Sequence, residues 1–245
     1  MSYEKARQYA KYRLPYSIEA AKFVIGEAGV SGGAVADIGA GTGLLTQHFA
    51  GQVAQVYAVE PEDEMRRLAR ELIGGHETNV EYIAGTAEQT FLPDQSVDLI
   101  VAANSYHRFQ PEAALKEFER ILRPGGWLAV FSYADEFNFL RDNMNVGRTI
   151  EEYSKRLKET RHSRPLQYFY GGTEPIKYLF PQELHERWEE YWGAAASGME
   201  APDKHEEWFR DFHTAHMERF GGLQKDGEIT VKYSTEVWLG QPDYR

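Results

Sequence analysis

The stretch Val-Ala-Asp-Ile-Gly-Ala-Gly-Thr-Gly-Leu-Leu, residues 35–45, carries the strongest structural signal in this chain. Its first residues belong to a short apolar run, typical of a buried strand, and its glycine cluster leads into helix-like spacing. Glycines let the backbone turn tightly and approach a ligand closely. In open parallel sheets, ligands bind beyond the carboxyl ends of the strands, where such a turn lies. The stretch therefore predicts a ligand-binding turn between a strand and a helix.

Short apolar runs and helical patterns alternate on either side of this turn. The strand-like runs are residues 34–38, 56–60, 80–83, 97–103 and 127–133, and the helix-like segments are residues 44–50, 62–73 and 111–122. Such alternation predicts βαβ units, and near-continuous apolar strands fit a sheet that is covered on both faces. The expected fold is therefore α/β, with a mostly parallel sheet and helices on both faces.

The pattern changes in the second half of the chain. Residues 135–220 have a helical pattern without a clear strand, and they are rich in large aromatic side chains. Residues 229–239 alternate and are β-branched after an Asp226-Gly227 turn signal, so they predict a long strand. We therefore expect one α/β domain, residues 1–134 and 221–245, with an antiparallel C-terminal strand. Residues 135–220 would be a helical insertion that acts as a substrate lid.

Composition narrows the class of protein. The chain is 42% hydrophobic and 27% charged, as expected for an ordinary soluble globular domain. It has no cysteine, which excludes disulfides, thiolate metal sites and a cysteine nucleophile. No apolar run reaches the roughly 18 residues of a membrane span, and the polar N-terminus is unlike a signal peptide, so we expect a cytoplasmic protein. The net charge of −11 disfavours a nucleic-acid partner, and no histidine–acid cluster at ligand spacing suggests a metal.

The spacing of the glycines indicates the kind of ligand. They follow a strict GxGxG pattern at Gly39, Gly41 and Gly43, and Leu44 stands where a dinucleotide-binding GxGxxG loop has its third glycine. Asp37 lies two positions before the first glycine. A carboxylate there suits a ligand with an amino group better than it suits a pyrophosphate. The loop therefore disfavours an NAD-dependent oxidoreductase.

Five segments resemble, in order and spacing, the motifs of class I S-adenosylmethionine-dependent methyltransferases. They are VADIGAGTGLL (35–45), YAVEP (57–61), GTAEQ (85–89), LPDQSVDLIVAA (92–103) and ILRPGGWLAVFS (121–132). The resemblance covers about residues 20–133 and is nearest to the type 11, ubiquinone/menaquinone-biosynthesis-type branch. Residues 233–241 (YSTEVWLGQ) are similar to the end of small-molecule members of that branch. The resemblance implies a Rossmann-like fold, S-adenosylmethionine as cofactor and S-adenosylhomocysteine as product.

The resemblance also implies roles for single residues in cofactor binding. The backbone of Gly39, Gly41 and Gly43 would pass beneath the methionine part of the cofactor, and Asp37 would lie near its ammonium. Glu60 would accept hydrogen bonds from the ribose hydroxyls, unless it is only a solvated helix start. The other contacts would be Pro61 and Met65 beside the adenine, Ala87 and Glu88 at its amino edge, and the backbone carbonyl of Asn104 near the methionine moiety. A simpler interpretation makes Glu88 a surface residue.

Two further groups of residues are candidates on the acceptor side. His107 follows the fourth strand, where acceptors enter in this family, and would be a general base if the nucleophile holds a proton. Tyr106 is a second candidate. Tyr9, Tyr12 and Arg13 resemble the arm that closes over the cofactor in this branch, so residues 3–16 are expected to form an arm or short helix over the ligand edge. Arg13 would hold the methionine carboxylate or an anionic substrate. The alternatives are a His107 that only packs or caps a helix, and a surface Arg13.

The predicted function is transfer of the sulfonium methyl group to a small-molecule acceptor by in-line displacement. Two alternatives stay open: a non-catalytic S-adenosylmethionine-binding regulatory module, and a tRNA or protein methyltransferase. The sequence leaves open which acceptor is used, whether O, N or C is methylated, and whether a base takes part. It also leaves the oligomeric state and the pathway open.

Overall fold

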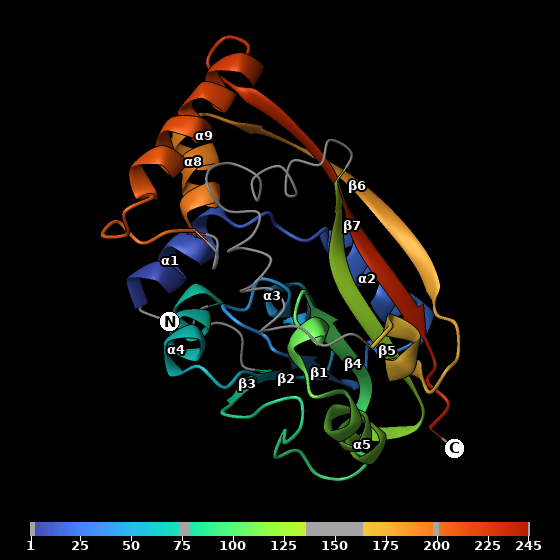
Figure 1. The fold of residues 1–245 in the computed structure, drawn as a ribbon. Coiled ribbons are helices and arrows are strands. Elements are labelled where there is room, and N and C mark those ends of the chain that lie inside the picture. Colours follow the sequence, from blue (N-terminus) through green and yellow to red (C-terminus); the bar gives the residue numbers. More distant parts are fainter. Residues whose placement is uncertain (1–2, 74–78, 136–163, 198–200, 245) are drawn as a thin grey trace.

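A seven-stranded mixed sheet forms the centre of the molecule, with strand order β3-β2-β1-β4-β5-β7-β6 (Figure 1). The computed structural model describes residues 3–73, 79–135, 164–197 and 201–244. The strands are β1 (Ala34–Ile38), β2 (Gln55–Val59), β3 (Val80–Ile83), β4 (Val97–Ala103), β5 (Leu122–Asp135), β6 (Ile176–Glu186) and β7 (Ile229–Gly240). The helices are α1 (Tyr3–Tyr12), α2 (Ile18–Ala28), α3 (Thr46–Phe49), α4 (Asp63–Ile73), α5 (Pro111–Ile121), α8 (Trp188–Ser197) and α9 (Phe209–Leu223), and the 3₁₀ turns are η1 (Tyr106–Arg108) and η2 (Leu166–Tyr170).

The directions of the strands confirm the predicted fold class. Strands β3, β2, β1, β4 and β5 are mutually parallel. Strand β7 runs antiparallel to both β5 and β6, which makes β6 the edge of the sheet. All five residues of β1 are buried, as expected for a central parallel strand that is covered on both faces.

Two hydrophobic cores lie on opposite faces of the sheet. Because side chains alternate along a strand, Ile38 and Ile100 face α5 and η2, while Val35 and Leu99 face α2 and α3. The N-terminal helix α1 lies away from both cores, against α4 and α8 (Figure 1). The structure confirms a short helix in this stretch, over Tyr3–Tyr12, while the expected position of residues 3–16 over the ligand edge stays a prediction.

The region predicted as a helical insertion also contains a strand. Residues 176–186 form β6 and pair with β7 along their whole length, from Ile176 opposite Leu239 to Glu186 opposite Ile229. The helical interpretation was wrong here because Pro181 interrupts the alternating pattern, whereas an edge strand tolerates proline. Residues 136–163 and 198–200 lie outside the described residues, so the structure does not test the rest of the predicted insertion there.

Much of the aromatic content of the insertion is packed between α8 and α9. Trp188 stacks on Trp192 with ring centroids 5.8 Å apart, and Tyr191 packs on Phe220 at 5.4 Å. Tyr191 and Phe220 also pack against Ile229, Val231 and Tyr233 of β7, so these rings join α8 and α9 to the sheet.

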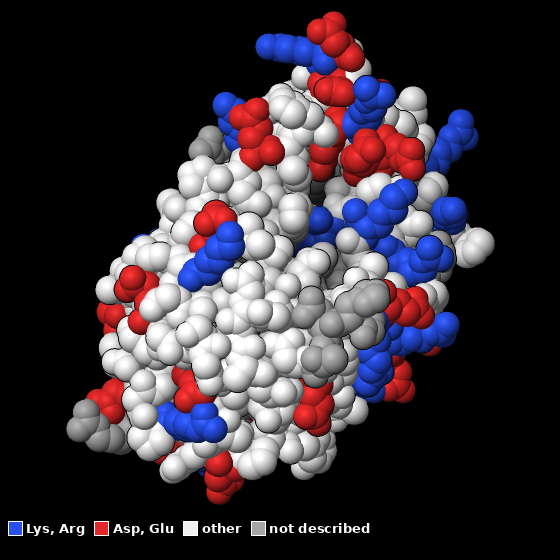
Figure 2. Space-filling model, turned by 180° about the vertical axis from the view of Figure 1, so that it is seen from behind, with Lys and Arg blue, Asp and Glu red and all other residues white. Residues whose placement is uncertain are grey.

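Figure 2 shows the face of the molecule opposite to that of Figure 1. Acidic side chains accompany the basic ones on this face, and its middle is largely uncharged. None of the helices in the described part of the chain combines the length and the apolar character that a membrane crossing requires.

Candidate cofactor-binding site

The loop from Asp37 to Gly43, here called the glycine loop, leaves the carboxyl end of β1. This strand lies between β2 and β4, where the strand order reverses direction, which is the place where open α/β sheets bind ligands. The N–H groups of Gly39 and Ala40 both donate to the carbonyl of Val59, at 2.8 and 3.1 Å. These bonds fix the loop against the end of β2.

All three glycines of the loop have positive φ, at 74° for Gly39, 58° for Gly41 and 80° for Gly43. A Cβ atom on Gly39 would lie 2.7 Å from Cβ of Ser105, and one on Gly43 would lie 2.7 Å from Cδ1 of Ile73. At Gly39 and Gly43 a side chain is thus excluded for two reasons, the positive φ of the turn and the close packing of neighbouring side chains. A Cβ on Gly41 would meet no atom of the described residues within 4 Å, so among them its backbone is open to the approach of a ligand.

Asp37 has a buried carboxyl group, and only one of its two oxygens accepts a hydrogen bond from the described residues. Its side chain is 1% exposed, and Thr46 Oγ1 donates to its Oδ2 at 2.7 Å. Among the described residues, Oδ1 has no hydrogen-bond partner. Burial raises the pKa of Asp37 to about 7, and the charge of Glu60 adds to this effect. Because buried polar atoms normally have partners, the free oxygen fits the ammonium group of a ligand.

Glu60 directly follows β2 and connects the glycine loop to α4. It is 8% exposed, and its Oε2 accepts from the N–H of Gly41 at 2.9 Å. Its Oε1 accepts from the N–H of Glu62 at 3.0 Å. Burial raises the pKa of Glu60, while these two bonds oppose the shift. The carboxylate is therefore not a solvated helix start, and each oxygen keeps lone-pair capacity for a ligand hydroxyl.

The residues predicted beside the adenine have varied surroundings. Pro61 is exposed, whereas Met65 is buried against Ala6 of α1. Ala87 is buried in the core. The carboxylate of Glu88 accepts from the N–H of Gln110 at 2.7 Å, just before α5. Glu88 therefore stabilises the start of α5. Contact of a ligand with Pro61, Met65, Ala87 and Glu88 stays a prediction.

The segment after β4 lies next to the glycine loop. Ser105 Oγ donates to the carbonyl of Ile38 at 2.8 Å, and the preceding Asn104 has φ 48°. Tyr106 and His107 follow in η1, where the two rings meet edge to face with centroids 5.9 Å apart. The ring of Tyr106 also packs against Phe169 of η2 at 6.1 Å.

The three predicted residues of the arm have different contacts. The guanidinium of Arg13 lies 5.3 Å from the ring centre of Tyr9 and 5.4 Å from that of Tyr133, at the end of β5. Tyr12 instead donates to Glu189 Oε1 of α8 at 3.2 Å. The structure thus brings Arg13 and Tyr9 together, whereas the hydroxyl of Tyr12 serves the contact between α1 and α8.

Sequence reasoning missed two tyrosines near the end of β4. Tyr16 stacks on Tyr133 with ring centroids 4.8 Å apart and an angle of 6° between the rings. Asn104 Nδ2 donates to the hydroxyl of Tyr16 at 2.8 Å. The only signal in the sequence was that Tyr133 ends a strand of the parallel sheet, where ligands bind.

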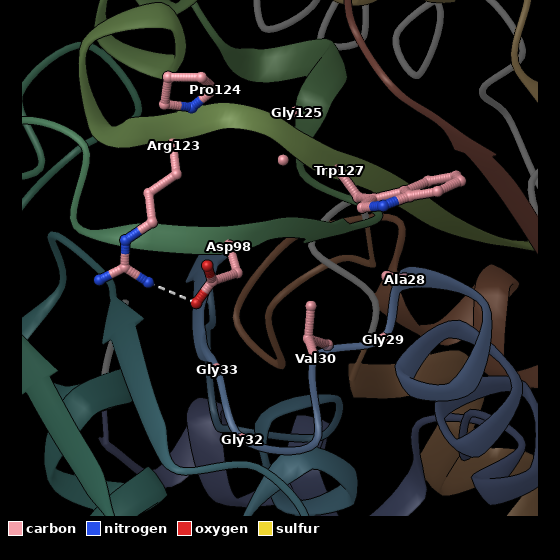
Figure 3. Close-up of a pocket in the computed structure, with 11 residues that line it drawn as sticks. Ala28, Gly29, Val30, Gly32, Gly33, Asp98, Arg123, Pro124, Gly125 and Trp127 are labelled. Carbon is pink, nitrogen blue, oxygen red and sulfur yellow. Dashed lines mark hydrogen bonds and ion pairs between the residues drawn. The ribbon is translucent and has the colours of Figure 1, made fainter.

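A separate cavity of about 370 Å³ lies at the opposite, amino-terminal edge of the sheet (Figure 3). Asp98 and Arg123 form an ion pair across it at 2.5 Å, and Trp127 lines another part of it. Asp98 Oδ2 also accepts from the N–H of Ala34 at 2.8 Å, which fixes the beginning of β1. The cavity is therefore remote from the glycine loop.

Comparison with known proteins identifies the region that contains the glycine loop. Residues 36–130 match the family model described as a methyltransferase domain. An uncharacterized methyltransferase of Mycobacterium tuberculosis is 36% identical over 153 residues, which are 61% of this chain and 60% of that protein. The ubiquinone/menaquinone biosynthesis C-methyltransferase of Hahella chejuensis is 34% identical over 124 residues, 48% of this chain and 50% of that protein. The chain thus spans about 60% of the length of the first curated relatives it matches.

Solved structures show the same fold over most of the chain. The YcgJ protein of Bacillus subtilis superposes with a TM-score of 0.58 at 19% sequence identity, covering 93% of this chain and all of that one. The matched residues 36–130 hold the glycine loop, Asp37 and Glu60. Residues 36–130 therefore resemble a methyltransferase domain over the part of the chain that holds the glycine loop and both buried carboxyl groups.

Proposed function

We propose that this chain transfers the methyl group of S-adenosylmethionine to a small-molecule acceptor. The observation that carries the proposal is the pair of buried carboxyl groups at the ends of adjacent strands, Asp37 and Glu60. The unpartnered Oδ1 of Asp37 suits the ammonium of the cofactor, and Glu60 suits its ribose hydroxyls. The open backbone at Gly41 lets the ligand lie against the loop between them.

The bound cofactor supplies an electrophilic methyl group on a positively charged sulfur. The residues of the chain have to orient it, hold the acceptor in line with the S–CH₃ bond and exclude water. Arg13 would pair with the methionine carboxylate or with an anionic acceptor from its place between Tyr9 and Tyr133. His107 or Tyr106 would accept a proton where the acceptor has one to lose.

Two observations support a small-molecule acceptor over tRNA. The net charge is −11, whereas proteins that neutralise phosphates need many basic contacts. Acidic side chains also accompany the basic ones on the face seen in Figure 2. The similarity to the Hahella chejuensis enzyme supports placement in the ubiquinone/menaquinone-biosynthesis-type branch, over half of the chain.

The insertion would act as the lid of this site, with α1 as its second wall. In support, Lys11 and Tyr12 of α1 both contact Glu189 of α8, and a Cβ atom on Gly193 would lie 2.5 Å from the ring of Tyr12. Closure of such a lid would exclude water and complete the site. The rings packed between α8 and α9 support a structural role for that part of the insertion.

Release of S-adenosylhomocysteine in a screen of small-molecule acceptors tests the proposal. We expect release that depends on both the acceptor and the cofactor, and that falls at least tenfold in Asp37→Asn. Binding of S-adenosylmethionine without release for any acceptor would instead favour a regulatory module. Release of S-adenosylhomocysteine only with tRNA or protein would instead favour a tRNA or protein methyltransferase.

A further inference from the structure

Helix α4 carries two neighbouring arginines with opposite surroundings. Arg66 is buried, with 8% of its side chain exposed, whereas 61% of the Arg67 side chain is exposed. Arg67 forms ion pairs with Glu64 and Glu71 of the same helix, at 3.9 and 3.3 Å. Arginine is almost never buried this far unless its charge is paired. The contacts of the buried guanidinium therefore indicate its role.

The guanidinium of Arg66 contacts the residue that directly follows β2. Its Nη1 donates to the backbone carbonyl of Glu60 at 2.5 Å, and its Nη2 donates to a carboxylate oxygen of Asp63. The side chain of Asp63 is 90% exposed, and an ion pair with so exposed a carboxylate contributes little. Asp63 therefore explains little of the burial, which brings Arg66 to Glu60.

The hydrogen bonds of Glu60 fix both its backbone and its side chain. Its N–H donates to the carbonyl of Ile83 at 3.0 Å, and its carbonyl accepts from Arg66. Its two carboxylate oxygens accept from the N–H groups of Gly41 and Glu62. The backbone is thus held on both sides of the side chain, so the carboxylate keeps one position next to the glycine loop.

Arg66 also opposes the electrostatic cost of burying Glu60. The charged groups that face Glu60 are Glu62 and Arg66 on the side of α4 and Asp37 of β1. Burial raises the pKa of Glu60 most, and the charge of Glu62 adds to this, whereas the charge of Arg66 lowers it. A carboxylate accepts hydroxyl protons through both oxygens, while a protonated carboxyl group has less capacity to accept. A positive charge at this place therefore favours the form of Glu60 that suits a ribose.

We propose that Arg66 is a positioning residue for the cofactor: it fixes the end of β2 and supplies the positive charge with which Glu60 meets the ribose hydroxyls as a carboxylate. The inference rests on the proposed methyl transfer, because it concerns the cofactor of that reaction. Arg66 acts through Glu60. Without Arg66, binding of the ribose should need a higher pH, because the buried carboxyl group would keep its proton longer.

The pH dependence of cofactor binding in Arg66→Gln tests this role. Calorimetry of the full chain gives the dissociation constant of S-adenosylmethionine at pH 6 and pH 8, and the ratio of variant to wild type at each pH removes the titration of Asp37. We expect affinity about tenfold below wild type at pH 6 and within about threefold at pH 8, since one pKa unit corresponds to tenfold. An equal loss at both pH values would indicate a merely structural residue and overturn the inference. Unchanged affinity at both would also overturn it, while leaving the methyl transfer intact.

Two further variants separate the charge of Arg66 from its other effects. Arg66→Lys keeps the charge and should stay within about threefold of wild type at pH 6, so it also carries the test if Arg66→Gln does not fold. A tenfold loss in Arg66→Lys would overturn the role of the charge. In a Glu60→Gln background, adding Arg66→Gln should change the dissociation constant by less than about twofold. A larger further loss would mean that Arg66 acts without Glu60, and would overturn the inference.

The matched control is Arg70→Gln, one turn further along α4. The guanidinium of Arg70 is exposed and lies 5.1 Å from the ring centre of Tyr82. This variant removes the same charge from the same helix, so cofactor affinity should stay within about twofold of wild type at both pH values. A loss at pH 6 equal to that in Arg66→Gln would assign the effect to net charge and overturn the inference. A wild type without affinity for S-adenosylmethionine would instead overturn the proposed function, and this inference with it.

Discussion

At the scale of single residues, Asp37 combines a structural disadvantage with a proposed role in ligand binding. Its carboxyl group is almost fully buried, receives one hydrogen bond from Thr46 and has one oxygen without a partner among the described residues. Burial disfavours the charged form and raises its pKa from 3.8 to about 7. A hydrophobic or neutral side chain would serve the fold better. We therefore attribute the acid at this position to the proposed ligand and not to the fold.

Asp37→Asn should stabilise the protein without cofactor at pH 8. The folded-state pKa of Asp37 is above its unfolded value, so its favourable contribution is complete below about pH 4 and is lost as pH rises through about 7. One pKa unit corresponds to about 1.4 kcal/mol, and we expect a gain of at least about 1 kcal/mol in the free energy of unfolding. Denaturant titrations of both proteins at pH 4 and pH 8 measure the difference. A variant that is less stable than the wild type at pH 8 would contradict this account.

The same carboxyl group should make cofactor affinity depend on pH. Between pH 5 and 7 the ammonium of S-adenosylmethionine stays charged, while Asp37 passes from its protonated to its ionised form. Affinity should therefore rise with pH, by up to about tenfold per unit, and level off near pH 7. Calorimetry at several pH values measures it, with Asp37→Asn as the control that should show a flat profile. An equal slope in the two proteins would assign the effect to another group.

Glu60→Ala should weaken cofactor binding at least tenfold. The change removes charge-assisted hydrogen bonds worth about 1.5–3 kcal/mol each, and about 1.4 kcal/mol is one decade of affinity. It also frees the N–H groups of Gly41 and Glu62. Glu81→Ala, which removes an exposed carboxylate on β3, is the control and should bind normally. An unchanged dissociation constant in Glu60→Ala would leave Glu60 as a tie between the loop and α4 only.

At the scale of elements, agreement between sequence and structure depends on where the stabilising contacts come from. Strands β1 and β4 have the bounds that their apolar runs predict, because both faces of each run are covered by nearby helices. Strand β3 also has its predicted bounds, although Glu81 is exposed and none of its residues is fully buried. Strand β5 extends to Asp135 because its outer half pairs with β7, from much later in the chain. Strand β6 was missed because its alternation contains Pro181 and its stability comes from one neighbouring strand.

Helix α2 was missed although its ends carry clear signals. Ser17 accepts from the N–H of Ala20 as an N-cap, and Gly29 ends the helix with φ 65°.

The residues of the candidate site likewise divide into those that the sequence predicted and those that it missed. Asp37 and Glu60 could be predicted because Asp37 lies near the end of β1 and Glu60 directly follows β2. The Tyr16–Tyr133 pair could not, because it depends on how the segment after α1 crosses the ends of β4 and β5.

The contact between α1 and α8 makes a prediction for the lid. A Cβ atom on Gly193 would lie 2.5 Å from the ring of Tyr12, so Gly193→Val should push α1 away from α8. We expect faster proteolysis within residues 3–12 and a higher KM for the cofactor, with the rest of the fold intact. Gly221→Ala in α9 is the control, because no atom in the described part of the chain lies within 4 Å of its added carbon. Equal proteolysis of both variants would mean that the arm is held by other contacts.

At the scale of the whole molecule, the parallel strands bring distant residues to one edge of the sheet. Glu60 and Asn104 directly follow β2 and β4, and Asp37 and Tyr133 lie near the ends of β1 and β5. The antiparallel β7 and the edge strand β6 complete the sheet and carry the chain toward α8 and α9 (Figure 1). The same edge is therefore reached by the methyltransferase domain, by the arm and by the insertion.

Calorimetric titration of the full chain with S-adenosylmethionine and, separately, with NAD tests the central claim most directly. We propose that the GxGxG loop after Asp37, with Glu60 at the end of the next strand, binds an aminated nucleoside, and the loop lacks the third glycine of a pyrophosphate loop. The account predicts saturable binding of S-adenosylmethionine and S-adenosylhomocysteine, and no binding of NAD at the same concentrations. Binding of NAD with no affinity for S-adenosylmethionine would contradict it.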